Sequence, residues 1–203
     1  MPPGSAASLH CNAASAPEAL APRGAAASLQ MISIDLLAPF ATPPYLAVKW
    51  VADGPGGGPG GAQVNLPLLS SRWGSPWPLG KDDFFRLWRT GELPEAQTKF
   101  TFNGAHEPSA IKALLASALR LSPLEGVDPS PNNVCAAGAI ACKSGVMPPA
   151  PGGHYALLRL EIIPNYAKAP DGSPRAASRL TCRATHAGIA ESIVAALTAH
   201  LGG

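Results

Sequence analysis

Two stretches of alternating side chains near the carboxyl end constrain the fold of this 203-residue chain more than any other feature. In the stretch ALLRLEII, Arg159 and Glu161 alternate with leucine and isoleucine, and in SRLTCRA, Arg179 and Arg183 alternate with smaller apolar residues. Successive side chains of a β-strand point to opposite faces of its sheet. Both stretches therefore predict strands that have one apolar face and one charged face.

The rest of the chain after residue 80 predicts helices and strands in a definite order. Helical spacing favours helices at residues 81–90, 109–121 and 188–201, and strands are predicted at residues 98–102, 134–142, 155–163 and 178–186, with a loop at 164–177. The last three strands follow one another without an intervening helix, which favours an antiparallel sheet covered by helices. The predicted fold class is α+β, with the element order α-β-α-β-β-β-α.

The first 70 residues have a different texture. Residues 1–28 are mainly Ala, Ser, Pro and Gly, and this composition predicts a disordered low-complexity tail. Strands are predicted at 29–37, 45–51 and 63–69, and we interpret the GPGGGPGG insert before the last of them as an expanded hairpin connection. Three strands alone are marginal, so they must pack on the next segment or belong to a domain whose beginning is missing.

Charge and cysteine content exclude several classes of protein. The net charge is only +2 and no block of like charge occurs, which argues against broad nucleic-acid binding. No cysteine stands in a C-x-x-C pair, and no apolar run reaches the ~18 residues of a membrane span. We expect a cytosolic protein with reduced thiols, no metal and no cofactor.

The candidate binding residues lie on the charged face of the predicted strands. If these strands are neighbours, Arg159, Arg179 and Arg183 form a cationic patch, and guanidinium groups can bind carboxylates with two hydrogen bonds. Polar residues on one side are also typical of any half-buried sheet. Alternation alone therefore leaves open whether this face is a binding site or only a solvated surface.

An aromatic cluster in the first predicted helix adds to the charged face. Trp88 lies three and four residues after Phe85 and Phe84, so it can share a helix face with either of them. Aromatic rings beside arginines would fit a short peptide that inserts Phe or Trp and presents Asp. The alternative is that all three rings are core and that Arg86 and Arg89 face outward.

Five segments, taken in this order, resemble the carboxy-terminal appendage, or ear, of alpha-adaptin, the large subunit of the plasma-membrane clathrin adaptor complex: LPLL, KDDFFRLWR, AIKALLASALRLSPLEGVDPSPNNVCAAGAI, LLRLE and RLTCR. The resemblance runs from about residue 29 to residue 201 and is strongest after residue 80. It implies an immunoglobulin-like β-sandwich followed by a platform of antiparallel sheet and covering helices. On this basis we expect a tail at 1–28, a partial sandwich at 29–70 and a platform at 79–203.

The resemblance also implies a function and a set of residues for it. The family's appendage is a non-enzymatic module that recruits endocytic accessory proteins through motifs such as Asp-Pro-Phe/Trp and Phe-x-Asp-x-Phe. This implies a cytoplasmic location at clathrin-coated pits, peripheral to the plasma membrane, with other adaptor subunits and the clathrin coat as further partners. By position, the peptide-binding residues are Trp88, Phe85, Phe84, Arg159, Glu161, Arg179 and Arg183.

This sequence departs from the family pattern at its amino-terminal end. Only the last strands of the sandwich align, which is compatible with a fragment, an incomplete gene model or a free-standing platform. Two other functions stay open on the residues alone. The arginines could bind anionic lipid headgroups, or a cysteine could serve a hydrolase, although Cys135 and Cys142 alternate with small apolar residues as core thiols do.

Overall fold

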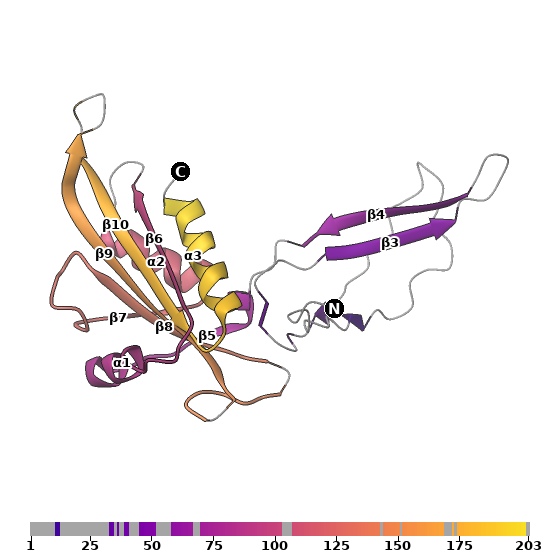
Figure 1. Cartoon of the computed structure of the whole chain (residues 1–203), viewed down its shortest axis with the longest axis horizontal. Helices are drawn as coiled ribbons and strands as arrows, with labels where there is room; N and C mark the ends of the chain where they lie inside the picture. The colour runs from indigo at the N-terminus through magenta and orange to yellow at the C-terminus, as the bar shows by residue number, and fades with distance from the viewer. Residues whose placement is uncertain are drawn as a thin grey trace.

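A six-stranded antiparallel sheet with helices on both faces forms the main body of the molecule (Figure 1). The computed structural model describes residues 11–12, 33–34, 36, 39–40, 45–51, 58–66, 70–102, 107–142, 144–150, 152–168, 172 and 174–201. Within these residues the order of elements from residue 81 onward contains the predicted α-β-α-β-β-β-α series, with one short extra strand. The α+β fold class predicted from the sequence is therefore confirmed.

The sheet is built around the two long strands that carry the alternating sequences. The strand order is β5 (Gly74–Pro76), β8 (Val134–Ile140), β9 (His154–Lys168), β10 (Pro174–Ala184) and β6 (Glu95–Thr101). A further strand, β7 (Ser122–Leu124), pairs with β8 on the same side as β5. All of these pairs are antiparallel. Consequently β9 and β10 lie in the middle of the sheet, where both of their faces are available for packing or for a site.

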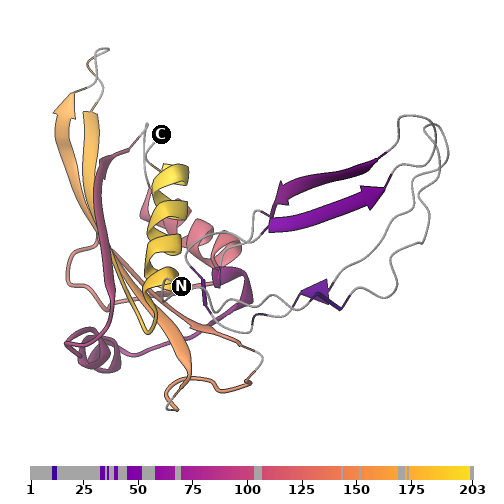
Figure 2. The same ribbon diagram turned by 45° about the vertical axis from the view of Figure 1, so that its right-hand side comes forward.

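Two helices, α2 (Pro108–Ala118) and α3 (Ala187–Leu201), cover one face of the sheet (Figure 2). Leu158, Leu160 and Leu180 point into this layer and are fully buried, together with Leu115 from α2 and Ile193 from α3. Leu158 and Leu160 occupy alternate positions of β9, so one face of this strand is packed into the core along this part of the sheet.

The opposite face is only partly covered. The short helix α1 (Lys81–Trp88) packs there through Phe84, which joins a smaller apolar cluster with Ala137 and Leu157. Because α1 has eight residues, it reaches only one end of the strands. The remaining part of this face is where Arg159, Glu161 and Arg179 lie.

Residues that precede the sheet also contribute to the larger core. Leu36 and Phe40 are buried in the cluster beneath α2 and α3, and the Phe40 ring meets Trp73 edge-on at 6.0 Å between centroids. The Ser70 hydroxyl accepts a hydrogen bond from the Phe40 backbone N–H and donates one to its carbonyl, both at 3.0 Å. Parts of the chain before residue 79 therefore stabilise the same core.

The amino-terminal segments differ in part from the sequence predictions. Strand β3 (Tyr45–Val51) agrees with the prediction and forms a hairpin with β4 (Pro59–Asn65), apart from the main sheet in Figure 1. The strand predicted at 63–69 is thus shifted into the glycine-rich insert, and residues 67–69 lie outside the described residues.

A short segment of the tail predicted to be disordered, residues 1–28, pairs with a short segment of the strand predicted at 29–37. Cys11–Asn12 (β1) pairs with Ser33–Ile34 (β2), and apart from Leu36 the other residues of these two ranges lie outside the description.

The loop predicted at residues 164–177 is wrong. Strand β9 continues to Lys168 and β10 starts at Pro174, so most of this segment is an extended hairpin. The loop was predicted because Pro164 lacks the backbone N–H that a regular strand pair uses, but here the register between the two strands shifts beside Pro164. A proline is tolerated at such an irregularity because fewer backbone hydrogen bonds depend on its missing N–H.

Candidate peptide-binding site

The strand register brings the predicted arginines onto one face of the sheet. Arg179 lies directly opposite Glu161 on β9 and opposite Lys99 on β6, while Arg159 lies opposite Thr181. Directly opposite residues of an antiparallel pair share a face. The charged alternation predicted from the sequence therefore becomes a single continuous surface that crosses three strands.

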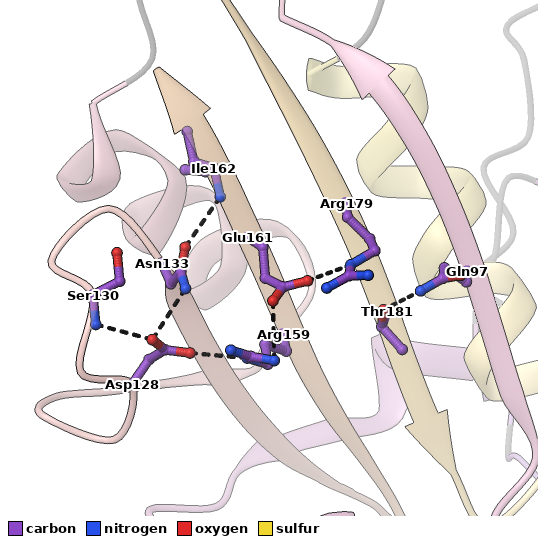
Figure 3. A network of polar contacts seen from close by, with 9 residues as sticks. All are labelled: Gln97, Asp128, Ser130, Asn133, Arg159, Glu161, Ile162, Arg179 and Thr181. Carbon is purple, nitrogen blue, oxygen red and sulfur yellow. Dashed lines mark hydrogen bonds and ion pairs between the residues drawn. The ribbon is translucent and has the colours of Figure 1, made fainter. Parts of the chain in front are cut away.

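A chain of charged and polar contacts crosses this surface (Figure 3). Glu161 accepts a hydrogen bond from Arg179 Nε through one carboxylate oxygen and pairs with Arg159 Nη1 through the other, at 3.1 Å. Because Glu161 lies between two guanidinium groups, the hydrogen bond from Arg179 and the nearby positive charges lower its pKa against a smaller opposing effect of burial. The carboxylate is ionised at neutral pH and fixes the orientation of both arginines.

Asp128 anchors the inner end of the network. Its side chain is only 3% exposed, and it accepts hydrogen bonds from Arg159 Nε at 2.8 Å, from the Ser130 backbone N–H at 3.0 Å and from Asn133 Nδ2 at 3.0 Å. Burial raises the pKa of Asp128, but these hydrogen bonds together outweigh it and the net pKa is lowered. Arg159 is therefore held between two carboxylates.

Arg183 connects the charged surface to the aromatic helix. Its Nε donates to Glu95 at 2.7 Å, one of its terminal nitrogens donates to the backbone carbonyl of Trp88, and the guanidinium carbon lies 5.2 Å from the Trp88 ring centroid. This distance is within the range of a cation–π interaction. Arg183 thus fixes the end of α1 against the sheet and places a positive charge beside the indole ring.

The three predicted aromatic residues have different positions. Trp88 and Phe85 are half-buried, whereas Phe84 is 0% exposed, so its expected place in an open pocket is corrected: it is part of the core beneath the helix. Phe84 stacks on Trp88 with ring centroids 5.4 Å apart and an interplanar angle of 19°. A helix of eight residues is marginal without tertiary packing, and the buried Phe84 supplies such packing while it supports the more exposed indole.

Two functional neighbours escaped the sequence analysis. Asp128 and Glu95 neutralise Arg159 and Arg183, and they lie 31 and 88 residues away from them in the sequence. The expected patch of free positive charge is therefore corrected to a surface in which each of the three arginines has a carboxylate partner. The acidic first position of the strand EAQTKFT was a sequence signal for Glu95, since it belongs to the same alternating face as Lys99.

The thiols of Cys135, Cys142 and Cys182 are poor nucleophiles. Burial, with a smaller effect of the Asp128 charge, raises the pKa of Cys135 to about 12, and burial raises the pKa of Cys142 and of Cys182 as well. A thiol protonated at neutral pH lacks the thiolate that cysteine catalysis requires. Among the described residues no group of three His, Cys, Asp or Glu could hold a metal ion, and no helix is long and apolar enough to cross a membrane.

The fold and this surface define an α+β platform whose charged face carries a half-buried tryptophan. The family model for the alpha adaptin AP2, C-terminal domain matches residues 72–201, which is more than half of the chain, and the chain belongs to this family. A curated relative, AP-2 complex subunit alpha-2 of Dictyostelium discoideum, is 24% identical over 174 residues, which cover 85% of this chain and 16% of the relative. The chain therefore spans only a small part of that relative's length.

Proposed function

We propose that this chain is a clathrin-adaptor appendage module that captures short acidic-aromatic peptides of endocytic accessory proteins on the charged face of its platform. Motifs such as Asp-Pro-Phe/Trp and Phe-x-Asp-x-Phe have the chemistry that this face accepts. The observation that carries the proposal is the half-buried Trp88 ring, supported from below by Phe84 and flanked by the Arg183 guanidinium. A ligand's aromatic ring can pack on the indole while its carboxylate reaches an arginine.

Arg179 is the best candidate for pairing with the ligand carboxylate. It is the most exposed of the three arginines and its only carboxylate partner among the described residues is Glu161, which also serves Arg159. A ligand carboxylate can approach Arg179 without leaving Glu161 unpaired. Exposed ion pairs contribute only ~0.2–1 kcal/mol each, so single motifs bind weakly and several motifs in one partner are needed for stable recruitment.

The proposal extends to the place of the chain in the cell and in an assembly. Its family and the name of the Dictyostelium relative support a cytoplasmic site of action at clathrin-coated pits, with adaptor subunits and the clathrin coat as neighbours. The proposed organisation keeps a platform after residue 79 and assigns residues 29–70 to the last strands of a sandwich. Anionic lipid binding is less well supported, because it gives no role to the half-buried Trp88 ring beside Arg183.

Calorimetric titration with a synthetic Phe-x-Asp-x-Phe peptide tests the pocket. Trp88→Ala should weaken binding at least about tenfold, as expected for a central aromatic anchor, while the circular dichroism spectrum stays native. Trp77→Ala is the matched control, because Trp77 is also half-buried in the same apolar cluster but packs on Tyr155, with centroids 5.3 Å apart. Its affinity for the peptide should stay within about twofold of the native value.

The same titration contains a charge reversal. Arg179→Glu should lower the affinity for the peptide. A peptide with Lys in place of Asp should recover part of the lost affinity, since the new pair restores opposite charges. If Trp88→Ala binds the peptide as tightly as the native chain does, the assignment of the pocket is contradicted. If the Lys peptide binds Arg179→Glu no more tightly than the Asp peptide does, direct charge pairing is contradicted.

A further inference from the structure

A hollow of about 640 Å³ lies on the charged face, beside the Glu161–Arg179 ion pair that forms part of its lining and on the side toward the tip of the β9–β10 hairpin. Its lining includes Lys99, Ile163, Tyr166, Ala177 and Arg179. Ile163 and Tyr166 are 56% and 64% exposed, which makes them two of the few large apolar side chains that the described part of the chain leaves in water. Exposed apolar side chains that gather at a concave surface are typical of a docking site.

The hollow follows from the register of the extended hairpin. Ile163 pairs with Ala177, and the next register pair is Ala167 with Arg175, so residues 164–166 lie opposite the single Ala176. Extra residues in one strand form a bulge, which bends the strand and re-aims its side chains. The small Ala177 leaves space beside Ile163, and the bulge places Tyr166 at the border of that space.

One rim of the hollow is positively charged. Lys99 and Arg179 are directly opposite each other on neighbouring strands, and like charges in this position repel. Glu161 compensates Arg179 from the other side, whereas Lys99 has no ion-pair partner in the part of the chain that the structure describes. A carboxylate brought by a ligand would relieve this repulsion, so the rim favours an acidic occupant.

The hollow lies within reach of a peptide that is anchored at Trp88. Arg183, beside the indole, and Ala177, in the hollow, are six residues apart on β10, which corresponds to about 20 Å along an extended strand. An extended peptide spans about 3.3–3.6 Å per residue. A ligand segment of about six residues therefore joins the two places.

We infer that the platform reads a longer peptide than the aromatic-acidic core: a second apolar side chain, about six residues from the aromatic anchor, packs between Ile163 and Tyr166, and a carboxylate next to it pairs with Lys99. This inference rests on the proposed function, because it takes the occupant to be a further segment of the same peptide. It assigns the extended hairpin a role in selecting among partners that share the short core.

Three synthetic peptides separate the inference from the proposed function. The first peptide is the Phe-x-Asp-x-Phe core alone. The second adds six residues that end in Leu-Glu, and the third adds six residues that end in Gly-Ser. Each extension is made in two versions, one at either end of the core. On the native chain the Leu-Glu peptide of one polarity should bind about fivefold more tightly than the Gly-Ser peptide, which corresponds to about 1 kcal/mol. The Gly-Ser peptide and the core alone should bind alike.

Substitutions at exposed positions locate the gain. Ile163→Ser should remove the advantage of the Leu-Glu peptide while the affinity for the core peptide stays unchanged. Lys99→Glu should abolish or reverse the advantage, which is read as the ratio of the two extended peptides' affinities, because the new carboxylate lies opposite Arg179 and also weakens binding of the core peptide. Lys168→Glu makes the same charge change on the β9–β10 hairpin, outside the lining of the hollow, and should retain the full advantage. A melting temperature near the native value confirms that each variant is folded.

Each result decides one of the two claims. Equal affinities of the Leu-Glu and Gly-Ser peptides on the native chain overturn the inference, and so does an advantage that survives both Ile163→Ser and Lys99→Glu. If Trp88→Ala still weakens the core peptide in those cases, the proposed function stands without the second subsite. In another outcome, Trp88→Ala leaves the affinity for the core peptide unchanged, but the advantage of the Leu-Glu peptide still depends on Ile163 and Lys99. The hollow then binds peptides and the Trp88 pocket does not.

Discussion

The two faces of the six-stranded sheet are made by the same strands and yet have opposite chemistry. On β9, Leu158 and Leu160 are fully buried against α2 and α3, whereas Arg159 and Glu161, one residue away, belong to a half-buried charged network. The face beneath α2 and α3 stabilises the fold by burial of apolar area, whereas the other face combines a smaller apolar cluster with ion pairs and hydrogen bonds. Apolar burial and charged contacts are therefore separated by a single residue step along one strand.

The first way to test this separation is to remove apolar volume from the buried face. Leu160→Ala should lower the free energy of unfolding by about 2–5 kcal/mol, because the fully buried side chain leaves a cavity that α2 and α3 cannot fill. Urea denaturation followed by circular dichroism measures the change. Ile163→Ala is the matched control on the same strand, and its 56% exposed side chain should cost less than about 1 kcal/mol. Similar losses at both positions would contradict the separation.

A second test uses the buried carboxylate of the charged face. Asp128→Asn should cost about 1–3 kcal/mol at pH 7, because Arg159 loses a charged hydrogen-bond partner. The pKa of Asp128 is lower in the folded chain than in the unfolded one, so its stabilising effect is present above about pH 4 and is lost as the pH falls through the folded value. Glu161, whose pKa is also lowered, behaves in the same way.

The expected signature is a gap in stability between native and Asp128→Asn chains that narrows as the pH falls below about 4. Asp83→Asn is the control, because Asp83 pairs with Arg86 at 2.8 Å on the exposed side of α1 and should change stability by less than about 0.5 kcal/mol. His154, whose pKa is lowered by burial, titrates identically in all three proteins and cancels in the comparison. A gap that stays constant with pH would exclude the ion pair as its cause.

The smallest expected effect concerns a separate hydrogen bond beside the charged network. Thr181→Val removes the hydroxyl that accepts a hydrogen bond from Gln97 Nε2 at 3.0 Å, while it keeps most of the side-chain volume. Because Gln97 is exposed and can turn to water, the loss should be below about 1 kcal/mol, and binding of the core peptide should not change. A larger loss of stability, or a loss of binding, would mean that this hydrogen bond is coupled to the charged network.

Much of the platform was predictable because its helices and long strands carry their own patterns. Helix α1 was predicted at 81–90 and runs over Lys81–Trp88, and the alternation of β9 and β10 placed three arginines and Glu161 on one face, where the structure has them. Patterns of this kind report which side of an element meets the core. The role of these residues in peptide binding stays a prediction.

The strands and contacts that could not be predicted from the sequence depend on partners far away in the chain. The three-residue strands β5 and β7 have no period of their own, and they exist because the edge of β8 offers them hydrogen bonds. Glu95 and Asp128 could not be assigned to their arginines before the register was known. Phe84 and Trp88 are separated by one helical turn, and only the packing of α1 on the sheet decides which of the two is buried.

The bulge at residues 164–166 has a consequence for how this hairpin can change in length. Three residues on β9 oppose one on β10, so the bulged strand carries two extra residues, and the alternation is the same on both sides of the irregularity. An insertion or deletion of a single codon there would exchange the inward and outward side chains of the outer hairpin, whereas a change of two codons would preserve them. Variation in the reach of the hairpin is therefore expected to proceed in steps of two residues.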